Sequence, residues 1–289
     1  MSRIIRFSLL TIAVLLIPTV LTAAGIDFPG AKSSWNGFDK YDFKLACGEF
    51  GERPCTVVCP KEPAEGNPWI WRAVFFGHEP QTEIAMLNNG YYVAFISCTD
   101  LVGSPQRVAQ CNCLYKFLTE KGLNKKTNLL GMSRGGISSM NWAIANPDCV
   151  RSIYIDNPVL DFKTWPGAIL GNLNRWEGDW QSVLNSYGFK NDDEAKAYKG
   201  NPVDAYGPLA ERKVPILLMC GTADKVVPFE FNGQPLFERY KAAGGIVKLV
   251  KKPGHDHHPH SLKDPKLIVD FYLNPPTECS EMETTYQGN

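Results

Sequence analysis

Short apolar runs that alternate with helical segments limit this chain to few folds. The clearest run is Tyr91–Ser97, in which polar residues do not alternate with apolar ones. Such a run is typical of a strand in a parallel sheet that is covered on both faces. Strands that alternate with helices over most of the chain predict an α/β fold, in which helices wrap a mainly parallel sheet.

The boundaries of these elements follow from apolar periodicity and from glycine and proline positions. The expected strands are 42–46, 55–59, 68–76, 91–97, 127–131, 150–155, 214–220 and 246–250. The expected helices are 81–88, 107–121, 137–145, 233–243 and a last one that starts with Asp264 as its N-cap and ends at Leu273.

One segment interrupts the alternation. Residues 161–212 place a long, polar and tryptophan-bearing stretch between two strands, which predicts a cap-like helical insertion over the cleft. We therefore expect one domain over 25–274 that includes this insertion. The polar residues 275–289 are expected to form a flexible tail.

The first residues are typical of an export signal. Arg3 and Arg6 precede the apolar run Phe7–Leu16, and the small residues 22–24 offer a cleavage site. The alternative is an uncleaved membrane anchor, but the run is short for crossing about 30 Å of hydrocarbon. The sequence thus predicts a signal peptide at 1–24, a periplasmic or extracellular location and no stable membrane insertion.

Charge and cysteine content further limit the classes of protein to which this chain can belong. Lys+Arg and Asp+Glu both number 30, so no nucleic acid partner is expected. The nine cysteines allow two interpretations. Either a disulfide bond forms within the group Cys47, Cys55 and Cys59, or several cysteines are buried free thiols. Oligomeric state does not follow from this sequence.

The sequence GMSRGG at 131–136 matches the nucleophile elbow G-x-S-x-G. In that motif a sharp turn between strand and helix exposes the serine at a helix N-terminus, where a developing anion is favoured. An apolar strand precedes the motif here and an apolar helix follows it, so Ser133 is predicted to be a nucleophile.

A catalytic triad also needs an acid and a base, in the chain order Ser, Asp, His. Asp224 lies in the turn after the strand at 214–220, and four of the five histidines lie in 255–260, after the last strand. We predict Asp224 as the acid and His257 as the base. His258 precedes Pro259 and is expected to turn away from His257.

Metal chemistry is the alternative interpretation of this histidine-rich loop. Adjacent imidazoles rarely face one ion, and no companion acidic cluster is evident. The pair Cys111 and Cys113 lacks the C-x-x-C spacing of a zinc site. The sequence therefore predicts neither a metal nor any other cofactor.

Five segments together carry a resemblance to a known family: WNGFDKYDF, PWIWRAVFFGHEPQ, GMSRGG, CGTADKVVP and PGHDHHPHSLKDP. The chain resembles exported bacterial α/β-hydrolases related to the prolyl-oligopeptidase-like and acetyl-xylan-esterase-like serine hydrolases. The resemblance implies the α/β-hydrolase fold and the same triad of Ser133, Asp224 and His257. This chain departs from the family pattern Gly-x-Gly-His-His-Pro-His at Asp256, which stands where the second glycine is usual.

An oxyanion hole should use the backbone N–H of Arg134 and a second N–H near Trp71 and Arg72. The Ser-Arg pair also resembles glucuronoyl esterases, in which the arginine side chain assists the oxyanion. The alternative is an Arg134 side chain held by a structural carboxylate.

These residues predict a secreted serine hydrolase that cleaves carboxylic esters of small molecules or acyl groups on polysaccharides. A serine peptidase of the prolyl-oligopeptidase-like type is the alternative. An inactive binding module on the same fold is a further alternative of another class.

Overall fold

The computed structural model describes residues 25–169 and 174–283, so the predicted signal peptide lies outside the described residues. Its central sheet has ten strands in the order β1-β2-β3-β5-β4-β6-β7-β8-β9-β10. The strands are β1 (Ala31–Trp35), β2 (Phe38–Ala46), β3 (Glu52–Cys59), β4 (Trp69–Arg72), β5 (Tyr92–Ile96), β6 (Thr127–Met132), β7 (Val150–Asp156), β8 (Ile216–Gly221), β9 (Val247–Lys252) and β10 (Ser280–Glu283).

The direction of pairing changes once across the sheet. Strands β1, β2, β3 and β5 pair in antiparallel fashion, and the pairs from β5 to β10 are parallel. The mainly parallel sheet that the sequence predicts is confirmed. The carboxyl ends of β6, β7, β8 and β9 consequently lie along one edge of the sheet, where ligands of such sheets bind.

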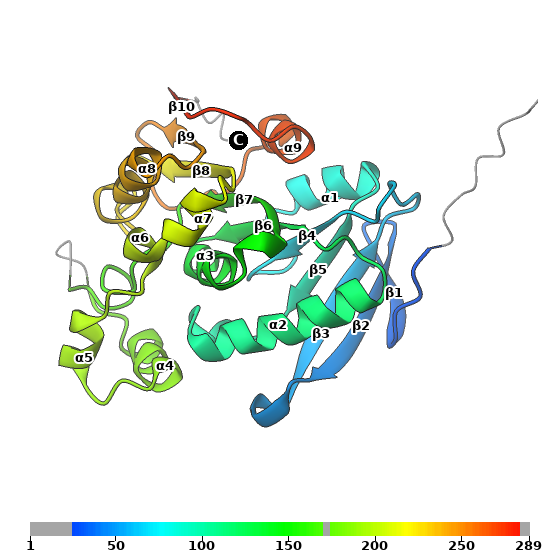
Figure 1. The fold of residues 1–289 in the computed structure, drawn as a ribbon, viewed down its shortest axis with the longest axis horizontal. Helices are drawn as coiled ribbons and strands as arrows, with labels where there is room; N and C mark the ends of the chain where they lie inside the picture. The colour runs from blue at the N-terminus through cyan, green and yellow to red at the C-terminus, as the bar shows by residue number, and fades with distance from the viewer. Residues whose placement is uncertain (1–24, 170–173, 284–289) are drawn as a thin grey trace, which may run out of the picture.

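Helices cover both faces of the sheet (Figure 1). One face is covered by α1 (Gln81–Asn88) and α9 (Lys266–Leu273), which bury Met86 and Phe271 against the strands. The other is covered by α2 (Pro105–Glu120), α3 (Gly135–Ala145) and α8 (Gly233–Ala242). Burial on both faces explains why the central strands lack alternating polar residues.

The observed strands differ from the predicted ones at the end of β4 and in the tail. The third predicted strand, 68–76, ends at Arg72, because the chain turns away there and Phe75 has a left-handed φ of +55°. The expected flexible tail instead contains β10, which pairs with β9 and aligns Ser280 with Lys248. The ammonium of Lys251 forms an ion pair with Glu281, which attaches this part of the tail to the sheet.

The segment 161–212 contains four helices among its described residues: α4 (Glu177–Tyr187), α5 (Asp192–Ala197), α6 (Pro202–Ala205) and α7 (Gly207–Glu211). The last two pack against α3. Helices α4 and α5 lie away from the sheet (Figure 1). The stretch before α4 contributes Trp165 and Trp176 to the rim of the sheet edge described below.

All nine cysteines are free thiols, so the structure favours the second of the two sequence readings. Burial raises the pKa of Cys55 to about 12. Within the described residues, no helix combines the length and apolar character that a membrane crossing requires.

Candidate active site

Ser133 occupies the turn between β6 and α3 with a φ of +51°. A residue with a side chain adopts this left-handed conformation at an energetic cost and persists there only where its surroundings enforce it. Three backbone hydrogen bonds do so. Ser133 N–H donates to the Asp156 carbonyl at 3.0 Å, and the Ser133 carbonyl accepts from the N–H groups of Gly136 and Val159, each at 2.9 Å.

The glycines around Ser133 permit close approach of backbone segments. A Cβ atom at Gly131 would lie 2.4 Å from the Gly135 carbonyl oxygen, and one at Gly136 would lie 2.3 Å from Cβ of Pro158. At Gly135 it would meet Cγ2 of Val74 at 2.8 Å. The elbow thus needs glycine for space at each of these positions, since none of the three has a positive φ.

The structure brings the three predicted triad residues together. His257 Nε2 lies 2.9 Å from Ser133 Oγ, and His257 Nδ1 lies 2.7 Å from Asp224 Oδ2. His257 and Asp224 are buried, with 5% and 6% of their surface exposed. The second carboxylate oxygen of Asp224 accepts two backbone N–H groups at 2.8 Å, from Val226 and Val227. This series of hydrogen bonds can pass a proton from the hydroxyl to the imidazole while the carboxylate fixes the tautomer.

Asn157, which is not among the residues predicted from the sequence, connects the loops that carry the acid and the base. Its side-chain N–H donates to the His257 carbonyl at 2.7 Å, and its Oδ1 accepts from Gly221 N–H at 2.6 Å. Asn157 directly follows β7 and is 2% exposed. Its place after a buried strand was the one available signal, because chains of this fold concentrate function at that edge.

Asp256, the departure from the family pattern, connects the same two loops. Its Oδ1 accepts from His257 N–H at 2.8 Å and from Lys225 N–H at 2.9 Å. These backbone donors lower the pKa of Asp256. The additional side chain therefore supports the loop geometry around the imidazole.

A buried ionic network lies beneath this site, centred on Asp156 at the end of β7. Asp156 accepts from Lys252 Nζ at 2.9 Å, from the Tyr154 hydroxyl at 2.7 Å and from Ser261 N–H at 2.7 Å. Burial by itself would raise the pKa of Asp156, but the Lys252 ammonium and the other donors outweigh it and hold that pKa far below its usual range. The carboxylate is thus a fixed negative charge that anchors the loop after β9.

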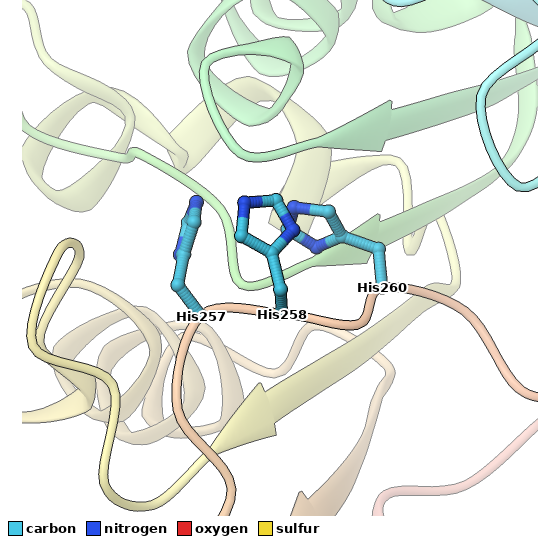
Figure 2. Close-up of side chains that lie close together, drawn as sticks. All are labelled: His257, His258 and His260. Carbon is cyan, nitrogen blue, oxygen red and sulfur yellow. The ribbon is translucent and has the colours of Figure 1, made fainter. Parts of the chain in front are cut away.

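Three imidazoles stand side by side on this loop (Figure 2). The ring centres of His257 and His258 are 5.0 Å apart, and those of His257 and His260 are 4.9 Å apart. The expectation that His258 turns away is therefore wrong. Burial lowers the pKa of both His258 and His260.

A pocket of about 330 Å³ opens directly onto Ser133. Its lining residues are Phe75, His78, Ser133, Arg134, Trp165, Trp176, Val226, His257, His258 and His260. Three aromatic residues, Phe75, Trp165 and Trp176, contribute to its wall. The pocket therefore presents an apolar surface within reach of the serine hydroxyl.

The Arg134 side chain lies in this aromatic wall. Its Nη1 donates to Asp179 Oδ1 at 2.8 Å, and its guanidinium stacks 4.6 Å from the ring centre of Trp165. Both partners of the ion pair are about one quarter exposed. This arrangement matches the alternative in which a carboxylate holds the arginine.

Arg72 is not available for the oxyanion role expected of it. Its side chain is fully buried and donates to Glu83 at 2.7 Å and to the His78 carbonyl at 2.8 Å. Its backbone lies within the sheet, paired with β5 and β6. Between described residues, no hydrogen bond uses the N–H groups of Arg134, Val74 or Phe75. The free donors other than Arg134 therefore follow β4 by two or three residues, and the sequence prediction misplaced this second donor because it extended that strand.

The sheet topology, the elbow and the Ser–His–Asp series define a serine hydrolase of the α/β-hydrolase fold. Residues 106–274, more than half of the chain, match the prolyl oligopeptidase family, and the chain belongs to that family. The search of curated protein sequences gives no match. The predicted fold class, family resemblance and enzyme class are thereby confirmed.

Solved structures show the same fold at low sequence identity. The puromycin-hydrolyzing peptidase of Mycobacterium tuberculosis is 14% identical with a TM-score of 0.62, over 85% of this chain and 41% of the peptidase. The acylaminoacyl peptidase of Pyrococcus horikoshii is 17% identical with a TM-score of 0.62, over 82% of this chain and 41% of the peptidase. This chain thus spans about two fifths of these peptidases.

Carboxyl esterase 2 of the fungus Tuber melanosporum is 17% identical with a TM-score of 0.56. In that case the match covers 83% of this chain and 82% of the esterase. The fold is therefore shared with both peptidases and esterases.

Proposed function

We propose that this protein is an exported carboxylic-ester hydrolase that acts through Ser133, His257 and Asp224. Ser133 Oγ attacks the acyl carbonyl while His257 Nε2 takes its proton, and Asp224 holds the imidazole. The protonated His257 then gives the proton to the leaving alkoxide, and water hydrolyses the acyl-enzyme by the reverse path. The N–H of Arg134 with that of Val74 or Phe75 stabilises the oxyanion.

The observation that carries this proposal is the aromatic pocket at Ser133. Its volume of about 330 Å³ is at the small end of the range for ligand pockets, roughly 300–1,000 Å³. Its walls are mainly apolar, so it suits a compact acyl group or one sugar ring better than a long peptide segment.

A polysaccharide carrier fits the outer part of the pocket. Trp176 is 52% exposed at its rim. A flat indole ring offers a large apolar face, on which the C–H face of a sugar can stack. The export signal proposed for residues 1–24 would deliver the enzyme to polysaccharides outside the cytoplasm.

Peptide hydrolysis is the second candidate, and family membership favours it. The matching family is that of prolyl oligopeptidase, and two of the similar structures are peptidases. The same triad chemistry cleaves amides when a peptide can be positioned against the serine.

The proposal is tested by comparing unactivated ester substrates with peptide substrates. An activated ester would not discriminate, because any serine hydrolase attacks it. The mature protein is assayed on acetylated xylo-oligosaccharides and on a panel of acyl-peptide anilides, with Ser133→Ala as the control. We expect kcat/KM for acetate release to exceed that for every anilide at least tenfold. Faster anilide cleavage would replace the esterase proposal with the peptidase one.

A further inference from the structure

The histidine loop holds a feature that the triad does not require. His257, His258 and His260 each present one ring nitrogen, and these three atoms lie within 4.8 Å of one another. Figure 2 shows the three rings rising from the same side of the loop. A triad uses only the first of these imidazoles, so the other two need a separate explanation.

His260 is the least satisfied of the three. It is 1% exposed, and neither ring nitrogen has a hydrogen-bond partner among the described residues. Its Nδ1 lies 3.5 Å from Asp156 Oδ1, which is at the outer limit of a hydrogen bond. A buried polar group without a partner is costly, and an ion is one of its recognised explanations. The same ring lines the pocket at Ser133, so its free nitrogen is within reach of a bound ion.

The chemistry of the cluster indicates which ion would bind. Three neutral imidazoles suit Zn²⁺, Cu²⁺ or Ni²⁺ and not Mg²⁺ or Ca²⁺, which prefer oxygen. Zinc sites with three protein ligands keep a fourth position open. At Zn–N distances of about 2.0–2.1 Å, tetrahedral ligand atoms lie about 3.4 Å apart. The exposed His258 ring can rotate to close the remaining distance.

A carboxylate already orients one of these rings as metal sites require, and a second carboxylate faces another of the rings. Ligating histidines usually give their second ring N–H to a carboxylate. His257 Nδ1 contacts Asp224 at 2.7 Å, and His260 Nδ1 faces Asp156. The outward nitrogen of His257 is Nε2, which also contacts Ser133.

We infer that His257, His258 and His260 form an inhibitory Zn²⁺ site that overlaps the catalytic centre. A zinc ion on His257 Nε2 occupies the lone pair that takes the Ser133 proton, so the metal-bound protein cannot generate the nucleophile. The inference goes beyond the proposed function, since metal binding requires no particular substrate.

Two measurements test the site. Zinc binding is measured by calorimetric titration of the Ser133→Ala protein, which keeps all three imidazoles. Hydrolysis of p-nitrophenyl acetate by the unaltered protein is measured in zinc buffers after chelator treatment. We expect the chelated protein to be active, zinc to reduce its rate at least tenfold, and chelator to restore it. Magnesium at the same concentrations should have no effect.

Single substitutions in the histidine loop identify which residues bind the zinc ion. His258→Ala and His260→Ala, each combined with Ser133→Ala, should raise the zinc dissociation constant by at least about tenfold. His255→Ala is the matched control on the same loop and should change it less than twofold. His258 is exposed, so His258→Ala alone decides the question if His260→Ala does not fold.

The outcomes separate this inference from the esterase proposal. Zinc binding that is unchanged in the His258→Ala variant would place the metal elsewhere, on thiols for example, and would overturn the inference. Full activity at zinc concentrations that saturate the Ser133→Ala protein would also overturn it. Zinc binding that needs His258 in a protein without esterase activity would support the site and reject only the proposed substrate class.

Discussion

The two walls of the cleft are built differently. On one side, the loops after β7, β8 and β9 are joined by buried hydrogen bonds, such as those from Asn157 to the His257 carbonyl and from Gly221 to Asn157. On the other side, the wall is formed by side chains from the segment before α4 and by the quarter-exposed ion pair between Arg134 and Asp179. The reaction geometry therefore depends on hydrogen bonds between buried loops, and the substrate-facing wall depends on side chains of the insertion and on one partly exposed ion pair.

The largest effect should come from the triad itself. Ser133→Ala and His257→Ala should each lower kcat by roughly 10⁴- to 10⁶-fold, because triad members act as a unit. Both variants should keep a cooperative thermal transition. Steady-state kinetics on p-nitrophenyl acetate measure this effect, with His255→Ala as the loop control. A rate within tenfold of the parent would remove that residue from the triad.

A pair of glycine substitutions compares how the two walls tolerate a side chain. Gly131→Ala should lower the free energy of unfolding by about 2–4 kcal/mol, since its Cβ would meet backbone at 2.4 Å. Gly178→Ala, in α4, meets nothing within 4 Å and should instead stabilise the protein by up to about 1 kcal/mol. Urea denaturation measures both values. Equal effects would contradict the difference between the walls.

The Asn157→Ala variant tests whether a residue that does not contact the substrate positions the catalytic loops. The loops carrying Asp224 and His257 lose their shared partner, so kcat should fall by roughly one to two orders of magnitude while KM changes little. Asn141→Ala removes a partly buried amide that contacts the Gly103 carbonyl and is the control. A change confined to KM would move Asn157 into substrate binding.

The next variant pair concerns Arg134, which lies in the substrate-facing wall. Arg134→Ala should raise KM and change kcat less than tenfold, because Asp179 and Trp165 already hold the guanidinium. The ion pair with Asp179, about one quarter exposed, should contribute only about 0–1 kcal/mol to stability. Asp179→Asn should reproduce a smaller version of the same KM effect. A fall in kcat of about 10²- to 10³-fold would instead assign the guanidinium to oxyanion stabilisation.

The smallest effect concerns pH and the network beneath the first wall. Burial lowers the pKa of His260, so the unfolded chain gains a proton first, and stability should fall as pH drops below 6.5. The pKa of Asp156 is also lowered in the folded state, so its contribution is present above 3.8 and is lost as pH falls further. Urea titrations at several pH values should show both declines. His260→Gln should remove the first one and leave the second.

The sequence predicts well whatever the local backbone pattern determines. Periodicity located the helix at Gln81–Asn88 and the strands that carry the elbow, and the elbow located Ser133. The sequence pattern does not reveal long-range contacts. The role of Asn157 becomes evident once β7 and the histidine loop are adjacent, and the arrangement of His258 beside His257 depends on tertiary packing.

The predicted oxyanion role of Arg72 is wrong for a different reason. The apolar run continues beyond the end of β4, so periodicity could not reveal where the chain leaves the sheet. The side chain is charged, yet it is satisfied in the interior by Glu83 and backbone carbonyls. Burial of a paired arginine in this way has no signature in a single sequence.

The pairing of β10 with β9 has a consequence for how this protein meets other molecules. An exposed sheet edge is a template for aggregation, and proteins protect it with short, charged outer strands. Here the outermost strands, β1 and β10, are five and four residues long and carry ion pairs at Lys32 and Glu281. Residues 280–283 cover the outer edge of β9, so their removal should expose that edge to strand exchange between copies of the enzyme.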